Sequence, residues 1–400
     1  MNGADMDRWR KLSVSLTSDL IKAKSLSGEE KEAAEVLAEA MRSAGFDEVA
    51  FDRYGNAVGS INGAEPGPTV LMDGHLDTVP VPDPSAWKRD PFSGDEADGK
   101  VHGRGASDMK GALAAMVAGA GAFKEATGGD FAGRICVAGV VQEELFEGVA
   151  ARQISEDYSP DVVIIGEASE LRLNIGQRGR AEIVVETEGV PAHSANPEKG
   201  VNAVLKMARL MERMDAELTP SEHPVLGKGI AVCTDVKSTP YPGASVVPSG
   251  CRATYDRRTL VGEDKASVLA PFQAVIDELA VQDPEFKAKV SYSQGDFVCY
   301  TGEPIRAERF FPAWLYDEDA DFVQKSLVGL KSVGQEPEIS HYSFCTNGSH
   351  YAGEAGIPTI GYGPSRENLA HTIDEYIEVE QLESAAAGYA GILAGLLGEV

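Results

Sequence analysis

Hydrophobic and polar positions along the first third of the chain follow both a helical and an extended period. Two amphipathic helices are predicted at 7–24 and 29–44. The second begins at Ser27-Gly28-Glu29-Glu30, where a serine cap and acids in the first turn favour a helix start. A segment at 111–124 is apolar on all sides, which is typical of a helix buried against a sheet.

Short strands are predicted around these helices, at 48–52, 58–62, 69–72, 134–141 and 161–165. The last two are continuous runs rich in β-branched residues. Such runs are typical of strands that are buried on both faces of a largely parallel sheet. This part of the chain therefore predicts an α/β layered domain.

The pattern changes near Gly179, because residues 180–189 alternate between apolar and polar as a half-exposed strand does. The elements predicted next are a helix at 201–218, strands at 230–237 and 251–256, a helix at 264–279 and a strand at 287–293. Strand-helix-strand-strand-helix-strand is the split βαβ arrangement of a small α+β sandwich.

The first pattern returns near residue 297, with a helix at 319–330, a strand at 357–362 and a helix at 380–397. A chain of 400 residues is too long for one compact core, so two domains are expected. We predict an α/β protein with a discontinuous domain, 1–179 and 297–400, built on a mostly parallel sheet. A ferredoxin-like α+β domain is inserted at 180–296.

Charge and composition narrow the class of protein. The formal net charge is -27, from 36 basic and 63 acidic residues, which disfavours binding to nucleic acid or to an anionic membrane. No apolar run approaches the roughly 20 residues that span a bilayer. No signal peptide is expected. The five cysteines lack Cys-x-x-Cys spacing, so we expect free thiols in a reducing cytoplasm.

Candidate chemistry begins at Asp73-Gly74-His75-Leu76-Asp77, directly after the apolar strand at 69–72. On an extended backbone His75 and Asp77 point to the same face, at the strand end where open α/β sheets place their ligands. An imidazole beside a carboxylate suits a metal ligand with an orienting partner. The alternative is a strand-to-loop turn with a solvated Asp77.

Carboxylates follow other predicted elements in the same way. Asp108 lies in a glycine-rich loop directly before the buried helix, where the alternative role is a helix cap. Glu143 and Glu144 follow the strand at 134–141, and adjacent carboxylates repel unless a cation or proton lies between them. One can bind metal while the other acts as general base, unless the pair is only the acidic first turn of a helix.

Glu167 follows the next apolar strand, and His371 lies beside acids near the end of the chain. With His75, Asp108 and Glu144 they make five ligands, enough for two divalent ions that share one carboxylate. Two-metal sites of this kind activate water for hydrolysis. The sequence therefore predicts a two-ion hydrolytic centre.

These segments resemble motifs of the co-catalytic zinc aminoacylase and carboxypeptidase family in type, order and approximate spacing. The family includes acetylornithine deacetylase, succinyl-diaminopimelate desuccinylase and carboxypeptidase G, and the resemblance covers nearly the whole chain. The matching segments are 74–80, 103–111, 143–144, 166–167 and 371–375. Residues 177–180 and 197–203 resemble most the uncharacterised hydrolase branch linked to selenium metabolism.

The resemblance implies a division of the five ligands. His75 and Glu167 would bind one ion, Glu144 and His371 the other, and Asp108 would bridge both. The ions would be zinc, with cobalt or manganese as alternatives.

The resemblance also implies roles for residues that do not bind metal. Asp77 would orient His75, and Glu143 would move a proton from the metal-activated water to the leaving amine. His193 in the inserted domain would stabilise the oxyanion, in its own or the partner subunit, with that domain acting as lid and dimer contact. Arg258 would bind a substrate carboxylate, as a guanidinium fork can.

The chain departs from the better-known members in the loop at 344–350, where Asn347 and His350 are candidate substrate contacts. His350 is equally compatible with an ordinary loop residue. The resemblance implies a cytoplasmic homodimer that cleaves an amide bond in a small carboxylate-bearing molecule, such as an N-acyl amino acid or a dipeptide. The alternatives are single-metal hydrolytic deamination of a non-peptide amine, and a non-catalytic dimeric scaffold.

Overall fold

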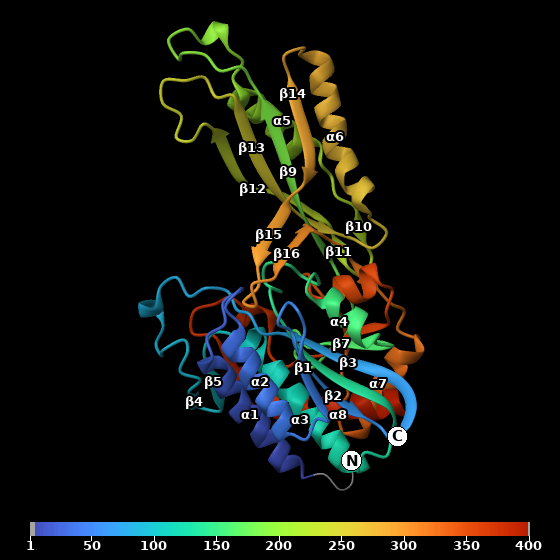
Figure 1. Cartoon of the computed structure of the whole chain (residues 1–400). Helices are drawn as coiled ribbons and strands as arrows, with labels where there is room; N and C mark the ends of the chain where they lie inside the picture. Colours follow the sequence, from blue (N-terminus) through green and yellow to red (C-terminus); the bar gives the residue numbers. More distant parts are fainter. Residues whose placement is uncertain (1–4, 399–400) are drawn as a thin grey trace. The chain divides into compact units, whose positions relative to one another are not determined.

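The computed structural model describes residues 5–398 and divides them into two units (Figure 1). One unit contains residues up to Gln177 together with Asp296–Arg306 and the chain from Leu315 onward. The other contains Arg178–Gly295 and Ala307–Trp314. The second unit therefore takes in residues 307–314, which the expected boundaries leave in the first, because the short strand β17 (Phe310–Phe311) pairs with β9 (Gly179–Glu188).

The first unit is built on a nine-stranded sheet of order β1-β2-β6-β3-β7-β20-β8-β18, with β19 also paired to β8. Its centre, β6-β3-β7-β20, is parallel, as continuous apolar runs predicted, and the mixed α/β fold class is confirmed. The strands are β1 (Glu48–Phe51), β2 (Ala57–Asn62), β3 (Glu65–His75), β6 (Ala132–Val140), β7 (Val162–Ile165), β8 (Leu173–Gln177), β18 (Trp314–Leu315), β19 (Ile339–Tyr342) and β20 (Thr359–Gly361).

Helices of the first unit bury their apolar faces against this sheet. The largest core joins α3, whose residues 111–123 are all buried, with neighbouring α1 and α8. The helices are α1 (Met6–Lys22), α2 (Lys31–Ser43), α3 (Gly111–Thr127), α4 (Ala151–Tyr158), α7 (Asp321–Ser332) and α8 (Val379–Leu397). A small sheet of β4 (Glu96–Ala97), β5 (Lys100–His102) and β21 (Tyr376–Glu378) lies apart from the main one.

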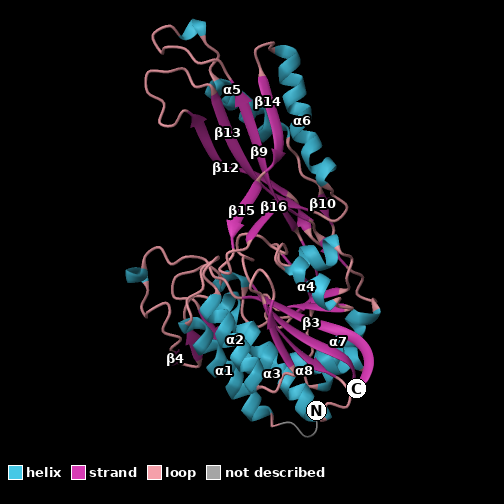
Figure 2. Cartoon of the chain, viewed as in Figure 1, coloured by secondary structure: helices cyan, strands magenta, loops and turns pink. Residues whose placement is uncertain are grey.

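The second unit has its own antiparallel sheet of order β12-β13-β9-β14, with β17 also paired to β9 (Figure 2). Helices α5 (Ala203–Glu217) and α6 (Lys265–Gln282) follow β9 and β13, so the element order is the predicted split βαβ. Their apolar residues, including Met207 and Phe272, share a separate core with the sheet. The other strands of this unit are β10 (Glu222–His223), β11 (Gly227–Lys228), β12 (Ile230–Thr239), β13 (Gly250–Thr259) and β14 (Lys287–Tyr292). The paired strands β15 (Gln294–Val298) and β16 (Pro304–Glu308) each have residues assigned to both units.

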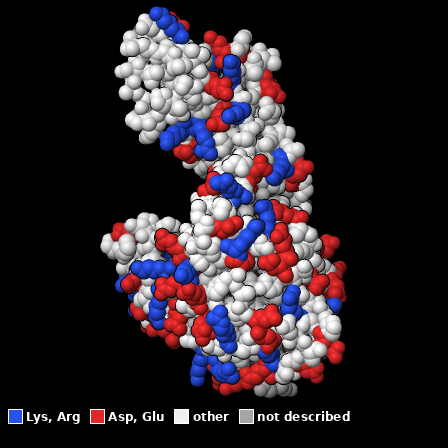
Figure 3. All heavy atoms as spheres, in the orientation of Figure 1, with Lys and Arg blue, Asp and Glu red and all other residues white. Residues whose placement is uncertain are grey.

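Charge is distributed unevenly over the second unit. Its loops at 189–197 and 238–250 contain no Asp, Glu, Lys or Arg, and Figure 3 shows a largely uncharged region at upper left. The two loops are joined by backbone hydrogen bonds, from Ser194 N to Ser245 O and from Val247 N to Ala192 O. Within residues 5–398 no helix is long and apolar enough to cross a membrane.

Candidate metal centre

The strands that carry the candidate ligands end side by side. β3 pairs in parallel with both β6 and β7, and His75 lies opposite Val140 in this register. Because parallel strands present their carboxyl ends at one sheet edge, the residues after β6 and β7 lie beside His75. Glu144 and Glu167 reach the site in this way.

Two groups of ligand atoms meet at this edge. His75, Asp108 and Glu167 offer atoms that all lie within 4.8 Å of one another, and so do Asp108, Glu144 and His371. Asp108 belongs to both groups: its Oδ1 lies 2.9 Å from His75 Nε2 and its Oδ2 3.1 Å from His371 Nε2. Its carboxylate therefore has the placement of a bridge between two cations.

His75 is oriented by a backbone carbonyl. Its Nδ1 lies 2.8 Å from the Asp77 carbonyl oxygen but 3.7 Å from the Asp77 carboxylate. The Nδ1–H donates to this carbonyl, which leaves Nε2 available as a metal ligand. The expected orienting role of Asp77 thus falls to its carbonyl group, while its carboxylate accepts the N–H groups of Glu143 and Glu144 at 3.0 and 3.1 Å.

Electrostatics favour a cation at this edge. Burial, followed by the charge of Asp108, raises the pKa of Glu144 to about 7, and the same two causes raise the pKa of Glu167. Burial would also raise the pKa of Asp108, but hydrogen bonds from His371 and His75 hold it well below its usual range. Hydrogen bonds to Asp108 and Glu144 raise the pKa of His371 to about 10.

The donor set fits divalent metal ions. Imidazole nitrogen and carboxylate oxygen are ligands of zinc, manganese and cobalt. Beside them, Glu143 is 6% exposed, and its Oε1 has no hydrogen-bond partner within residues 5–398. A buried oxygen without a donor needs a water or an ion. The residues present therefore match a two-ion site with a free carboxylate next to it.

The loop that presents Asp108 is fixed by a buried carboxylate from the end of the chain. Glu375 is fully buried, and its Oε1 accepts the N–H groups of Ser107 and Asp108 at 2.9 and 3.2 Å. Its other oxygen pairs with Arg104. Since His371 lies four residues before Glu375, this contact ties two ligand-bearing segments together.

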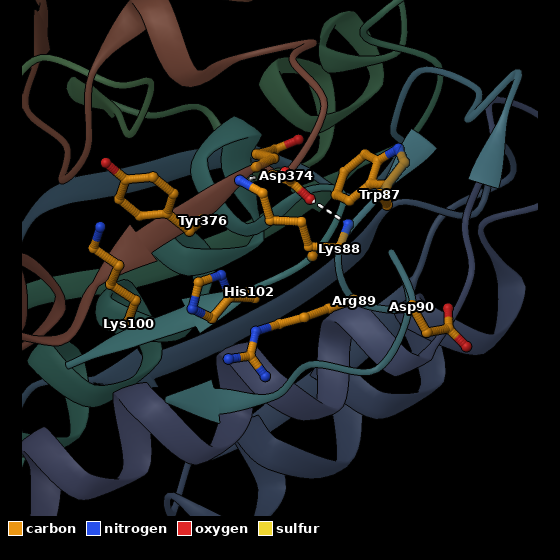
Figure 4. Close-up of a pocket in the computed structure, with 10 residues that line it drawn as sticks. Trp87, Lys88, Arg89, Asp90, Lys100, His102, Asp374 and Tyr376 are labelled. Carbon is orange, nitrogen blue, oxygen red and sulfur yellow. Dashed lines mark hydrogen bonds and ion pairs between the residues drawn. The ribbon is translucent and has the colours of Figure 1, made fainter. Parts of the chain in front are cut away.

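A second contact anchors the His371 segment from outside. Asp374 accepts hydrogen bonds from the backbone N–H of Lys88 at 2.7 Å and forms an ion pair with Lys88 Nζ at 3.2 Å (Figure 4). These residues line a pocket of about 210 Å³, together with Trp87, His102 and Tyr376. None of the five candidate ligands lines this pocket, so it is separate from the metal groups.

Asn347 and His350 have partners inside the first unit. Asn347 is 2% exposed; its Oδ1 accepts from Gly148 N at 2.7 Å and its Nδ2 donates to Asp73 at 2.9 Å. The ring nitrogens of His350 lie 2.9 Å from Ser155 Oγ and 3.0 Å from Glu354. The hydrogen-bonding groups expected to contact substrate are thus engaged in structural interactions.

Arg258 and His193 belong to the second unit. Arg258 Nε donates to Asp256 at 2.9 Å on the half-exposed face of β13, while Arg257 is buried and pairs with Glu263. The two arginines therefore point to opposite faces, as their spacing predicts. His193 is exposed in the uncharged loop at 189–197, where its Nδ1 accepts from Ala195 N at 3.0 Å.

Asp73 lies near the candidate ligands and was not assigned a role from the sequence. Asp73 is 1% exposed inside β3, two residues before His75 and therefore on the same face of the strand. Burial raises its pKa to about 6 in spite of hydrogen bonds from Asn347 and Tyr351. A carboxylate within an apolar strand was the available signal, because such a group needs buried donors.

Comparisons with known proteins agree with this geometry. Residues 71–395 match the model of peptidase family M20/M25/M40. The chain is 34% identical to the protein YgeY of Escherichia coli (strain K12) over 97% of this chain and 94% of that one. It is 30% identical to a succinyl-diaminopimelate desuccinylase of Cereibacter sphaeroides, over 95% of this chain and 97% of the relative.

The fold also matches solved structures. The aminopeptidase PepT of Bacillus cereus superposes with a TM-score of 0.73 at 19% identity, covering 97% of this chain and 98% of that one. The chain belongs to peptidase family M20/M25/M40. It is a metal-dependent hydrolase of amide bonds, as the sequence predicted.

Proposed function

We propose that the protein cleaves the amide bond of a small carboxylate-bearing substrate, an N-acyl amino acid or a dipeptide, with two divalent ions. The observation that carries this proposal is the position of Asp108, whose two oxygens face His75 and His371. Glu167 completes one ligand group and Glu144 the other. Bound ions polarise the amide carbonyl and lower the pKa of water. We propose zinc, with cobalt and manganese as alternatives.

We assign the general base to Glu143. Its carboxylate belongs to neither ligand group, yet the residue directly precedes the ligand Glu144. Its N–H is held by Asp77, and its Oε1 lacks a donor within residues 5–398. A carboxylate held in this way can take a proton from water and deliver it to the leaving nitrogen.

Substrate recognition is proposed to involve the second unit. Arg258 lies on the half-exposed face of β13, where its guanidinium can bind a substrate carboxylate. The desuccinylase relative, whose name gives a succinyl-diaminopimelate substrate, supports a carboxylate-bearing molecule. Asn347 and His350 are proposed to support the substrate site indirectly, because the side chains of both are hydrogen-bonded to other residues of the first unit.

We further propose a homodimer that forms through the second unit. The edge strand β12 exposes Ile230, Val232 and Val236 by 41%, 49% and 46%, and apolar side chains on an unpaired edge favour pairing with another chain. The uncharged loop that carries His193 suits burial against a second copy. There His193 would stabilise the oxyanion in its own or its partner's site. A cytoplasmic location is supported by the five cysteines, none of which forms a disulfide.

A substrate screen tests the reaction class. Protein loaded separately with zinc, cobalt or manganese is assayed against N-acyl amino acids, dipeptides and non-peptide amines. Turnover of an acylated amino acid or dipeptide is expected. Release of ammonia from the amines, without cleavage of any amide, would contradict the proposal.

The variant Glu143→Gln tests the assignment of the base. It is expected to lower kcat by about a thousandfold, within the range for loss of a positioned base, while the metal content measured by elemental analysis stays unchanged. Glu156→Gln, on the exposed face of α4, is the matched control and should keep full activity. A Glu143→Gln variant with normal turnover would show that another group moves the proton.

A further inference from the structure

The turn after β6 is held by side chains from other parts of the chain. β6 ends at Val140, and the next N–H groups leave the sheet ladder just where the metal site begins. Buried N–H groups need acceptors, and here side chains supply them. The bonds run from Val141 N to Asn56 Oδ1 at 2.9 Å, Gln142 N to Glu30 Oε1 at 3.1 Å, and Glu143 N and Glu144 N to Asp77 at 3.0 and 3.1 Å.

Glu30 is the least expected member of this set. It lies 112 residues before Gln142 in the sequence, in the connection between α1 and α2, and it is fully buried. Its Oε1 also accepts the Gly28 N–H at 2.9 Å, so one oxygen joins two backbone segments. Its Oε2 has no hydrogen-bond partner within residues 5–398. Within residues 5–398 the side chain of Glu30 forms no hydrogen bond or ion pair with a candidate metal ligand.

The backbone at Gln142 needs such a support. Gln142 has φ of +61°, in the left-handed region that a residue with a side chain rarely adopts. The connection that carries Glu30 also packs closely on the same neighbourhood. A Cβ atom built on Gly28 would lie 3.3 Å from Val298 O and 3.4 Å from the Gln142 side chain, which itself donates to Val298 O.

We infer that Glu30 is a positioning residue for the general base, acting through the Gln142 N–H to fix the turn that presents Glu143. Asp77 accepts the amides of Glu143 and Glu144, while Glu30 accepts the amide of Gln142, the residue with positive φ. Glu30 reaches the chemistry only through the backbone and is not itself catalytic. The inference rests on the function proposed for Glu143.

The test compares three variants with the metal-loaded wild-type protein. Glu30→Ala removes both acceptor oxygens, Glu30→Gln keeps Oε1, and Glu29→Ala changes the exposed neighbour as a control. Hydrogen–deuterium exchange of a peptide covering 141–145 reports whether the Gln142 N–H is still hydrogen-bonded. Steady-state kinetics, measured as kcat and KM, report whether Glu143 is still correctly positioned.

Glu30→Ala is expected to speed exchange at 141–145 and to lower kcat by about 100-fold, the scale of a displacement near 1 Å, with KM and metal content unchanged. Glu30→Gln and Glu29→Ala are expected to stay within about threefold of the wild-type kcat, since neither removes the acceptor.

Three results would overturn the inference. They are wild-type exchange and kcat in Glu30→Ala, a kcat loss accompanied by loss of an ion, and a large kcat loss in Glu30→Gln. If Glu30→Ala does not fold, the kcat of Glu30→Gln still tests the inference. Full activity of Glu143→Gln would instead refute the proposed base, while exchange in Glu30→Ala would still report whether Glu30 holds the turn.

Discussion

Glu354 connects α4 with the turn at Ser349–Glu354, and its replacement by glutamine tests this connection. Arg152 of α4 donates to both of its carboxylate oxygens, at 3.0 and 2.7 Å. The Nδ1–H of His350 donates to it at 3.0 Å, which leaves Nε2 to accept from the Ser155 hydroxyl at 2.9 Å. These hydrogen bonds connect α4 with the turn that contains Tyr351.

The magnitude follows from the pKa of Glu354. Burial alone would raise it, but hydrogen bonds from His350 and Arg152 lower the pKa from 4.5 to about 2. At about 1.36 kcal/mol per pKa unit, the difference of 4.5 − 2 sets a ceiling of about 3.4 kcal/mol. The side chain is 30% exposed, so solvent screening reduces the expected contribution to about 1–2 kcal/mol.

The pH dependence has a fixed sign. A carboxylate with a lowered folded-state pKa stabilises the fold fully above the unfolded value of 4.5, and this contribution is lost as the pH falls through 2. In urea unfolding at pH 7, Glu354→Gln should lower the free energy of unfolding by about 1–2 kcal/mol, and at pH 3.5 by less than about half of that amount.

The control for this experiment is Glu156→Gln on the same helix, where the side chain is exposed. It should change the free energy of unfolding by less than about 0.5 kcal/mol. Equal effects of the two substitutions at pH 7, or a Glu354→Gln effect that grows on acidification, would refute the reasoning.

Three further predictions concern the core and the metal site. Tyr351 Oη donates to the buried Asp73 at 2.8 Å, so Tyr351→Phe should lower the free energy of urea unfolding by about 1–3 kcal/mol; no change would mean that this bond contributes nothing. A Cβ on Gly361 would lie 2.3 Å from the Tyr342 ring, so Gly361→Ala should cost about 1–3 kcal/mol and lower Tm, which an unchanged thermal melt would contradict. Stripping the ions with dipicolinate should lower Tm and added zinc should restore it, because a ligand at a thousand times its Kd stabilises by about 4 kcal/mol; a Tm insensitive to both treatments would argue against the site.

Periodicity predicted the regular elements well because their burial repeats along the chain. α3 and the central parallel strands are recognisable in the sequence as continuous apolar runs. α4 (Ala151–Tyr158) did not, because it has eight residues and buries only Ala151 and Ile154. β17 is two residues long, and its pairing with β9 decides where residues 307–314 belong.

The sequence predicted which candidate ligands would come together where they follow strand ends, as for His75 and Glu167. The sequence did not predict the role of side chains that form hydrogen bonds with residues far along the chain instead of with their own helix. Ser27 and Glu30 were expected to begin a helix, yet α2 starts at Lys31. Ser27 donates to Asp77 and Glu30 accepts from Gln142, because the buried groups beside the candidate ligands need these partners more than an exposed helix end does.

The central claim is that the carboxyl ends of β3, β6 and β7 form a site for two divalent ions that share Asp108. Counting the bound ions tests this claim most directly. Elemental analysis of dialysed protein after loading with zinc, cobalt or manganese should give about two ions per wild-type chain, as a two-metal hydrolytic site requires. Asp108→Ala should lose this stoichiometry, while Glu143→Gln should keep it. One ion or none in the wild-type protein with every metal would contradict the account.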